Sequence, residues 1–102
     1  MKLNWKDSTF NTNNDEYDKE FIKSEENYLQ SRLSFDGFLF LNHALNSLGF
    51  KQIKRGQLDG WLWDNDDPAG QIAIKIKLKS ENGDLILILN EEKNILDHAF
   101  LD

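Results

Sequence analysis

Apolar and polar positions follow a helical spacing in the first half of the chain. The first such stretch predicts a helix over residues 15–33, and Asn14 or Asp15 supplies a suitable N-cap. Acidic side chains in its first turn suit the positive end of the helix dipole. The residues between Ser34 and Gly37 predict a break after it. The apolar residues that share one face of this helix are Tyr17, Phe21, Tyr28 and Leu29.

A second helix is predicted over residues 38–48. Either Ser34 or Asp36 is placed to cap its start, and Gly49 stands where a left-handed residue commonly ends a helix. Its apolar stripe recurs at helical intervals and consists of Phe38, Leu41, Leu45 and Leu48.

The second half of the chain alternates in the manner of β-strands. Residues 61–63 predict a short strand, residues 72–79 a longer one, and Asn82-Gly83 a two-residue type I′ hairpin turn. Residues 85–89 are apolar on both faces and so predict a central strand. Residues 95–101 predict the last strand, with a short helix as the alternative. The turn fixes the cross-strand pairs as Leu78 with Leu87, Ile76 with Leu89, Lys79 with Ile86, and Lys77 with Ile88.

These elements predict an α+β fold, with two N-terminal helices packed on a three- to four-stranded antiparallel β-meander. Residues 1–14 are polar and Asn-rich and predict a partly ordered lead-in, followed by a single domain over 15–102. We expect the second helix to cover the sheet face that carries Ile74, Ile76, Leu78, Leu87 and Leu89.

Four segments between about Asn27 and Phe100 form a recognisable pattern. They are Phe38-Leu39-Phe40-Leu41-Asn42, Leu48-Gly49-Phe50, Gly56-Gln57-Leu58-Asp59-Gly60-Trp61 and Leu87-Ile88-Leu89-Asn90. With this pattern the chain resembles an uncharacterised family of small proteins from phages and other mobile elements of Gram-positive bacteria. The resemblance implies such a source for the protein, and it implies no particular activity.

The composition and charge of the chain exclude several classes of protein. The 102 residues include no cysteine, which excludes a disulfide scaffold, a thiolate zinc site and a cysteine nucleophile. No apolar run is long enough for a membrane helix and the first residues lack a signal-peptide pattern, so we expect a cytoplasmic protein without a membrane partner. A net charge of −6 argues against binding to nucleic acid.

Catalytic and ligand-binding motifs are not recognisable. Gly56 and Gly60 lack the following helix of a phosphate loop, and no serine lies in a nucleophile-elbow motif. The acidic loop from Asp64 has Pro68 at the fifth position, where a calcium loop needs a ligand. His43 and His98 are isolated. The sequence therefore predicts no enzyme, no metal and no cofactor.

The remaining candidate is the surface, where aromatic residues alternate with acidic ones. Aromatic anchors provide affinity and charge speeds association, as in an inhibitor that docks on a basic enzyme. We therefore expect a small acidic binding protein that neutralises or regulates a protein partner, in its most concrete form an immunity protein or inhibitor acting on a basic toxin or nuclease. The candidate partner-binding residues are Trp5, Tyr17, Phe40, Trp61, Trp63, Asp64, Asp66 and Asp67.

The alternative is a structural or accessory protein of a mobile element that self-associates, for example as a homodimer. A sheet edge at Trp61–Trp63 or at Ile95–Phe100 would then pair with a second copy. The basic strand face of Lys75, Lys77 and Lys79 is either functional or only solvated.

Overall fold

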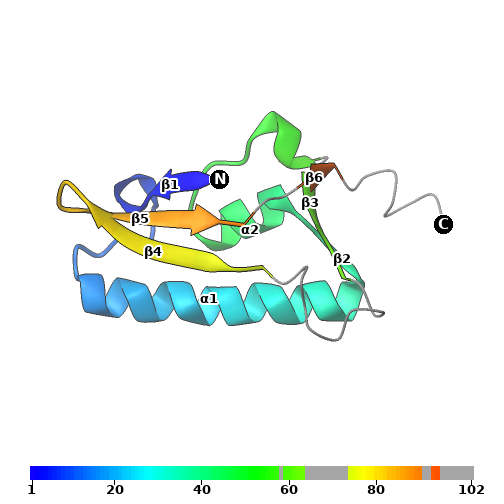
Figure 1. Ribbon diagram of the computed structural model, residues 1–102, viewed down its shortest axis with the longest axis horizontal. Helices are drawn as coiled ribbons and strands as arrows, with labels where there is room; N and C mark the ends of the chain where they lie inside the picture. The colour runs from blue at the N-terminus through cyan, green and yellow to red at the C-terminus, as the bar shows by residue number, and fades with distance from the viewer. Residues whose placement is uncertain (58, 64–73, 91–92, 95–102) are drawn as a thin grey trace.

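A single long helix spans two small antiparallel sheets that lie end to end above it (Figure 1). The computed structural model describes residues 1–57, 59–63, 74–90 and 93–94. In chain order the elements are β1 (Lys2–Asn4), the 3-10 turn η1 (Trp5–Asp7), α1 (Asp15–Asp36), β2 (Phe38–Phe40), α2 (Leu41–Ser47), the 3-10 turn η2 (Lys54–Gln57), β3 (Asp59–Leu62), β4 (Ile76–Glu81), β5 (Asp84–Leu89) and β6 (Lys93–Asn94).

Helix α1 begins where the sequence predicts and ends three residues later. The Asn14 side chain accepts a hydrogen bond from the Tyr17 N–H at 3.2 Å, so Asn14 is the N-cap. The helix continues to Asp36 and stops at Gly37, whose φ of +85° is left-handed. Its buried residues are Asp18, Ile22, Leu29 and Leu33.

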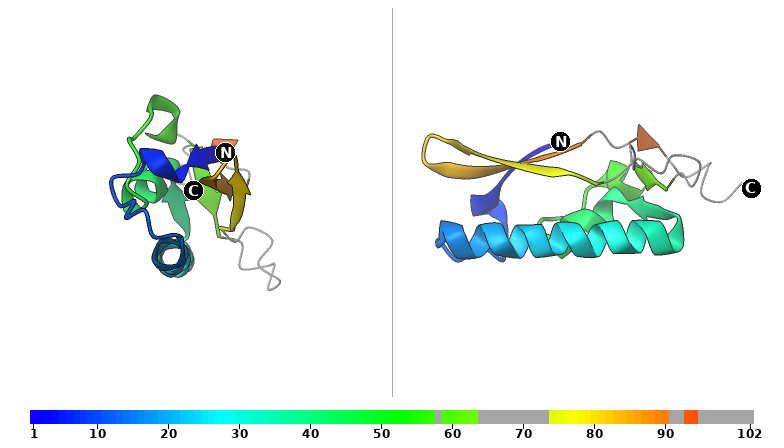
Figure 2. Two further views of the ribbon diagram at one scale, coloured as in Figure 1. Left: turned by 90° about the vertical axis from the view of Figure 1, so that its left-hand side faces the viewer. Right: turned by 60° about the horizontal axis from the view of Figure 1, so that its bottom comes forward.

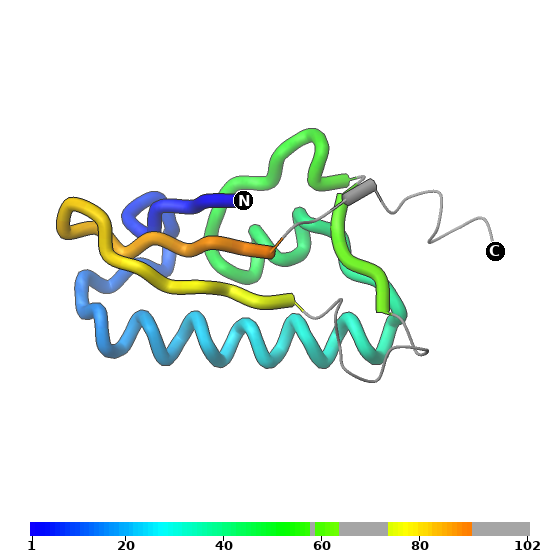
Figure 3. The backbone as a smooth tube through the Cα atoms, in the orientation of Figure 1, coloured from blue at the N-terminus to red at the C-terminus, as the bar shows by residue number. Residues whose placement is uncertain are grey.

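The first sheet has the strand order β1–β5–β4 (Figure 3). The predicted central position of β5 is confirmed, and all four predicted cross-strand pairs of the hairpin are present. The turn residues Asn82 and Gly83 have φ values of 52° and 84°, as a type I′ turn requires. The hairpin is therefore set by its local sequence.

The second sheet has the strand order β2–β3–β6, so the fold is α+β but is not one β-meander. Residues 38–40 form β2 rather than the start of a helix, and only Leu41–Ser47 are helical. The reason is tertiary: Leu39 pairs with Trp61 across the two strands, and each side chain is 2% exposed. Helix α2 lies against β2 and β3. The two helices are thus not both N-terminal, since β1 and β2 precede α2.

The first residues, which we expected to be a partly ordered lead-in, supply a strand and a core side chain. Lys2–Asn4 form β1, which pairs with β5 about 84 residues later in the chain (Leu3 with Leu87). Trp5 is 2% exposed, and its ring lies 6.2 Å from that of Phe21 and 5.9 Å from that of Phe50. This segment therefore covers one end of the core.

Three polar side chains hold separate segments of the chain together. Asp18, only 1% exposed, accepts hydrogen bonds from the backbone N–H of Thr12 at 3.2 Å and from its hydroxyl at 2.6 Å. The Asn42 side chain both accepts from and donates to the backbone of Ile53.

Asn90 connects the two sheets. Its Oδ1 accepts from Trp61 Nε1 at 3.2 Å and from the Lys75 backbone N–H at 3.0 Å. Each of these polar groups is satisfied inside or at the edge of the core, which keeps its burial from being costly.

The predicted core residues Ile74, Leu87 and Leu89 are at most 3% exposed, whereas Ile76 and Leu78 are half-buried beside α1. The predicted strand over 95–101 lies outside the described residues, as do 72–73 of the strand before the hairpin. Among the helices described, none has a segment long and apolar enough to cross a bilayer.

We predict that Gly56→Ala destabilises the protein by about 2–4 kcal/mol. A Cβ at this position would overlap the Asn42 side-chain amide and displace it from the Ile53 backbone. Gln57→Ala, at the exposed neighbouring position, should change stability by less than about 0.5 kcal/mol. Urea unfolding of both variants measures this, and equal stabilities would contradict the packing described.

We also predict an acid-dependent loss of stability through Asp18. Burial raises the pKa of this carboxyl, but the hydrogen bonds that it accepts from the hydroxyl and backbone N–H of Thr12, with the Trp5 indole nearby, outweigh burial and leave the pKa below its ordinary value. A lowered folded-state pKa gives stability that is fully present above the unfolded pKa of about 3.9 and is lost as the pH falls through the folded pKa.

The test is the free energy of unfolding between pH 7 and pH 2.5. Asp18→Asn should be less stable at pH 7 and should lose less stability in acid, because its side chain does not titrate. Thr12→Val, which removes one of the two donors, should fall between the two proteins. If the free energy of unfolding of Asp18→Asn fell with pH as steeply as that of the wild type, the acid sensitivity would come from other groups.

Candidate protein-binding surface

Large apolar side chains that face solvent are few in the described residues, and they gather around one helix. They are Tyr17, Tyr28 and Phe35 of α1, exposed to 59%, 46% and 86%, and Phe10 in the loop before it, exposed to 46%. Contiguous exposed apolar surface is uncommon on monomeric proteins and is typical of interaction sites.

Helix geometry puts the three α1 residues in one line. Tyr28 follows Tyr17 by eleven residues and Phe35 follows it by eighteen, about three and five helical turns. Phe21 is half-buried between them, and its ring lies 5.5 Å from that of Phe10. We call the surface formed by Phe10, Tyr17, Phe21, Tyr28 and Phe35 the aromatic flank.

The aromatic flank is beside the buried face of α1 and not opposite to it. The end-on view in Figure 2 shows α1 below the other elements, so that the described residues cover only its upper side. Ile22, Leu29 and Leu33 point into the core. The side of α1 across the buried face from the flank lies beside β4 and the residues before it. There Glu26 accepts a hydrogen bond from the Ile76 backbone N–H, and Gln30 accepts one from the Ile74 backbone N–H.

Helix α2 borders the middle of the flank. Tyr28 and His43 have ring centroids 6.1 Å apart, and the Tyr28 hydroxyl lies 3.4 Å from His43 Nε2. At that separation the hydrogen bond is weak, so it orients the phenol ring without holding it in the core. One ring of the flank therefore has a polar group at its edge, as is common for interface tyrosines.

The titratable side chains in the described part of the chain do not form a metal-binding cluster. No three His, Asp or Glu side chains converge there in a way that would hold a metal ion. An open hollow of about 640 Å³ beside Trp5 is lined by amides and carboxylates such as Asn11, Asn14 and Asp84.

Residues 3–98 match the model of DUF6353, a family of unknown function. The chain belongs to this family. The matched range contains all four segments that carried the resemblance, and that family was correctly expected to be uncharacterised. The match gives no indication of a phage or Gram-positive source. No curated protein and no solved structure matches the chain.

Of the residues we predicted to bind a partner, Tyr17 is exposed in this DUF6353 chain. The expected exposure of Trp5 and Trp61 is wrong, because each is 2% exposed in the core. Phe40 and Trp63 are half-buried. The other three, Asp64, Asp66 and Asp67, lie outside the described residues.

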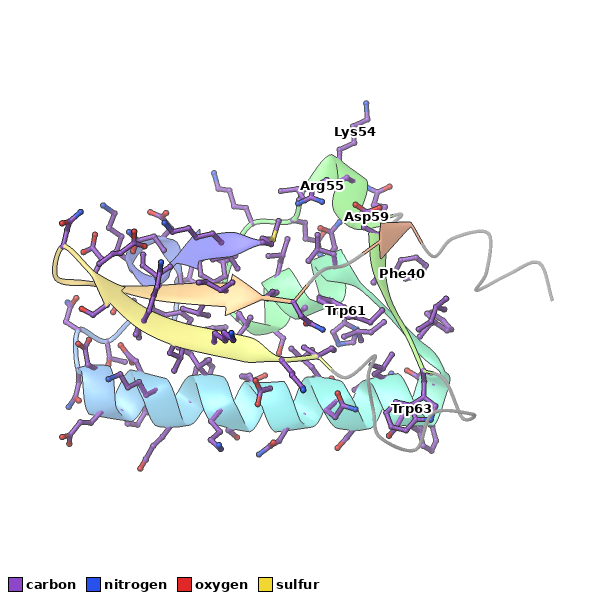
Figure 4. The ribbon with its side chains drawn as sticks, in the orientation of Figure 1. Phe40, Lys54, Arg55, Asp59, Trp61 and Trp63 are labelled. Carbon is purple, nitrogen blue, oxygen red and sulfur yellow. The ribbon has the colours of Figure 1, made fainter. Side chains whose placement is uncertain are left out.

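Figure 4 shows how β2 and β3 separate the aromatic residues. Trp61 points into the molecule, where Asn90 binds its indole N–H, and Phe40 lies on the opposite side of the sheet with Phe38 at 5.5 Å. Trp63 lies beside the end of α1, and its backbone N–H donates to the Gly37 carbonyl at 3.0 Å. The labelled Arg55 forms an ion pair with Asp59 at 3.2 Å.

The predicted sheet edge at Trp61–Trp63 is also wrong in part. Strand β3 is the middle strand of its sheet: Gly60 pairs with Phe40 on one side and with Lys93 on the other. The second predicted edge, Ile95–Phe100, lies outside the described residues.

Sequence reasoning missed Phe10, Tyr28 and Phe35 as surface residues. Tyr28 was placed on the apolar face of the predicted helix and was not proposed as a surface residue, and Phe35 fell in the predicted break. A plot of α1 as 22 residues rather than 19 separates the two groups, since the aromatic residues form a line beside Ile22 and Leu29 rather than among them.

We predict opposite consequences for two of the aromatic residues proposed from sequence. Trp61→Ala should cost about 3–5 kcal/mol of stability, since it empties a core site and removes a donor to Asn90. Tyr17→Ala should change the stability by less than about 0.5 kcal/mol. Denaturant unfolding measures both, and a large loss in Tyr17→Ala would show that the flank belongs to the core.

Proposed function

We propose that this DUF6353 protein is a small, non-catalytic binding protein that neutralises or regulates a protein partner through the aromatic flank of α1. One observation carries the proposal: the described large apolar side chains that face solvent all gather on that flank. Tyrosine and phenylalanine on a rigid helix lose little conformational entropy on binding, which makes them effective anchors.

Charge around the flank favours a basic partner. The first turns of α1 carry the exposed acidic residues Asp15, Glu16 and Glu20, and the whole chain has a net charge of −6. Such a surface attracts a basic protein over a distance of about 10 Å at moderate salt and raises the association rate. Aromatic anchors beside acidic residues suit an inhibitor of a basic enzyme.

The most concrete form of the proposal is an immunity protein or inhibitor in a bacterial or phage conflict system, acting in the cytoplasm on a basic toxin or nuclease. Small size, acidity and the lack of recognisable catalytic motifs support this form. The protein would act by covering its partner's active surface, with no chemistry, metal or cofactor of its own.

The second candidate function is self-association as a structural or accessory protein. The sheet edge that first suggested self-association is not an edge at β3, because β3 has a strand on each side. The aromatic flank supports self-association as well, because an exposed apolar line on a helix fits a second helix.

The proposal predicts partner capture that depends on the flank. The tagged full chain is used to isolate proteins from a lysate of its own source, beside the variant Tyr28→Ser/Phe35→Ser. We expect one basic protein at equal ratio with the wild type and at least tenfold less of it with the variant, because two anchors are lost.

The matched control is Lys19→Ser/Lys23→Ser, which shortens two exposed side chains on the other side of the same helix. It should capture the partner as the wild type does. Recovery of the same partner by the flank variant would reject the flank as the docking surface, and recovery of no foreign protein by any of the three would reject the proposed function.

A further inference from the structure

The aromatic flank continues along α1 as a regular seam. Six residues follow one another at alternating intervals of four and three, the spacing with which one helix packs along another. All but the half-buried Phe21 are exposed. The seam residues, in order, are Tyr17, Phe21, Ser24, Tyr28, Ser31 and Phe35.

We propose that this seam binds the same seam of a second copy of the chain, with the two α1 helices antiparallel. The protein then forms a two-fold symmetric dimer in which each copy covers the aromatic flank of the other. The dimer uses the surface of the proposed function but does not depend on a foreign partner, which would instead have to displace the second copy.

The order of large and small residues along the seam is self-complementary in this direction. When the helices cross near residue 26, Tyr17 faces Phe35 of the second copy at both ends of the contact. Ser24 faces Tyr28, so each phenol ring lies over a small side chain. Large residues against small ones at facing positions are what close packing requires.

Phe21 is the bulkiest position of the seam, and in the antiparallel pair it faces Ser31, the second small residue. Phe21 carries the ring of Phe10 against it at 5.5 Å. In a parallel pair each residue would face its own copy, so that serine would meet serine and the Phe21 positions would collide with two additional Phe10 rings. Packing therefore favours the antiparallel direction.

Electrostatics favours the same direction. The first two turns of α1 hold the acidic residues Asp15, Glu16 and Glu20, and a parallel pair would bring these together with their copies. An antiparallel pair separates each of them from its copy along the axis, by about 33 Å for Asp15, about 30 Å for Glu16 and about 18 Å for Glu20, and it aligns the two helix dipoles favourably. Arg32, near the other end, is then closer to the acidic end of the second copy.

The contact is small. One side of a 22-residue helix provides an interface at the low end of the specific range, about 1,200 Å² in total. We expect a dimer that dissociates on dilution into roughly the micromolar range, and this would allow a tighter partner to replace the second copy.

The chain contains no cysteine, so single cysteines report the pairing directly. The variants Ser24→Cys and Ser31→Cys each place one thiol on the seam. In the antiparallel pair the two copies of position 24 are offset along the axis by about 6 Å and those of position 31 by about 15 Å, from the rise of 1.5 Å per residue. In a parallel pair both offsets are zero.

Each full-length variant is treated with a short bismaleimide at about 100 µM, well above the expected dissociation range, and after a thousandfold dilution to about 0.1 µM, below it. We expect Ser24→Cys to give about tenfold more cross-linked dimer than Ser31→Cys at the high concentration, and the yield to fall on dilution. Adding Phe35→Ser to Ser24→Cys should remove most of the product, while the circular dichroism spectrum stays helical.

Equal yields from the two positions would show parallel pairing and overturn the proposal, as would no product from either or a product that does not depend on concentration. The result is separate from that of partner capture. Cross-linking at position 24 without a captured partner supports the dimer and rejects the proposed function, and the reverse result keeps the function and rejects the dimer.

Discussion

The structure depends on one helix that covers two sheets at once. Helix α1 is about 33 Å long by its 22 residues, and the described molecule has a longest extent of 44 Å. Its buried line, Ile22, Leu29 and Leu33, is the surface on which the first and second sheets both rest. Because a helix this long needs only one face to hold these sheets, an adjacent side stays free to carry exposed aromatic residues without loss of stability.

Small polar side chains keep the segments around α1 in place. The chain is rich in Asn, and several of these amides have defined structural positions: Asn14 caps α1, Asn42 holds the Ile53 backbone, and Asn90 joins the two sheets through Trp61. An amide that donates and accepts at once substitutes for a missing strand or turn contact. These amides hold connecting segments in place that the small apolar core does not hold by itself.

How well each element could be predicted from the sequence depended on how far apart along the chain its contacting residues lie. The register of the β4–β5 hairpin was predicted to the residue, because Asn82-Gly83 permits one register. The role of Lys2–Asn4 in β1 was not predicted, since its partner strand lies more than 80 residues away. Phe38 fits a helical stripe as well as a strand, and only pairing with β3 decides between them. The flank was missed because helical periodicity alone does not separate a buried line from an exposed one.

The central proposal is that α1 holds the fold with one face and binds a second copy of the chain with the aromatic flank beside it. Hydroxyl-radical footprinting of the full chain, compared between dilute and concentrated solutions, tests it most directly. The account predicts that oxidation of Tyr17, Tyr28 and Phe35 falls together in the concentrated solution, while Trp61 stays weakly oxidised in both. Unchanged oxidation along the flank, or protection confined to the outer face of the second sheet at Phe38 and Phe40, would contradict it.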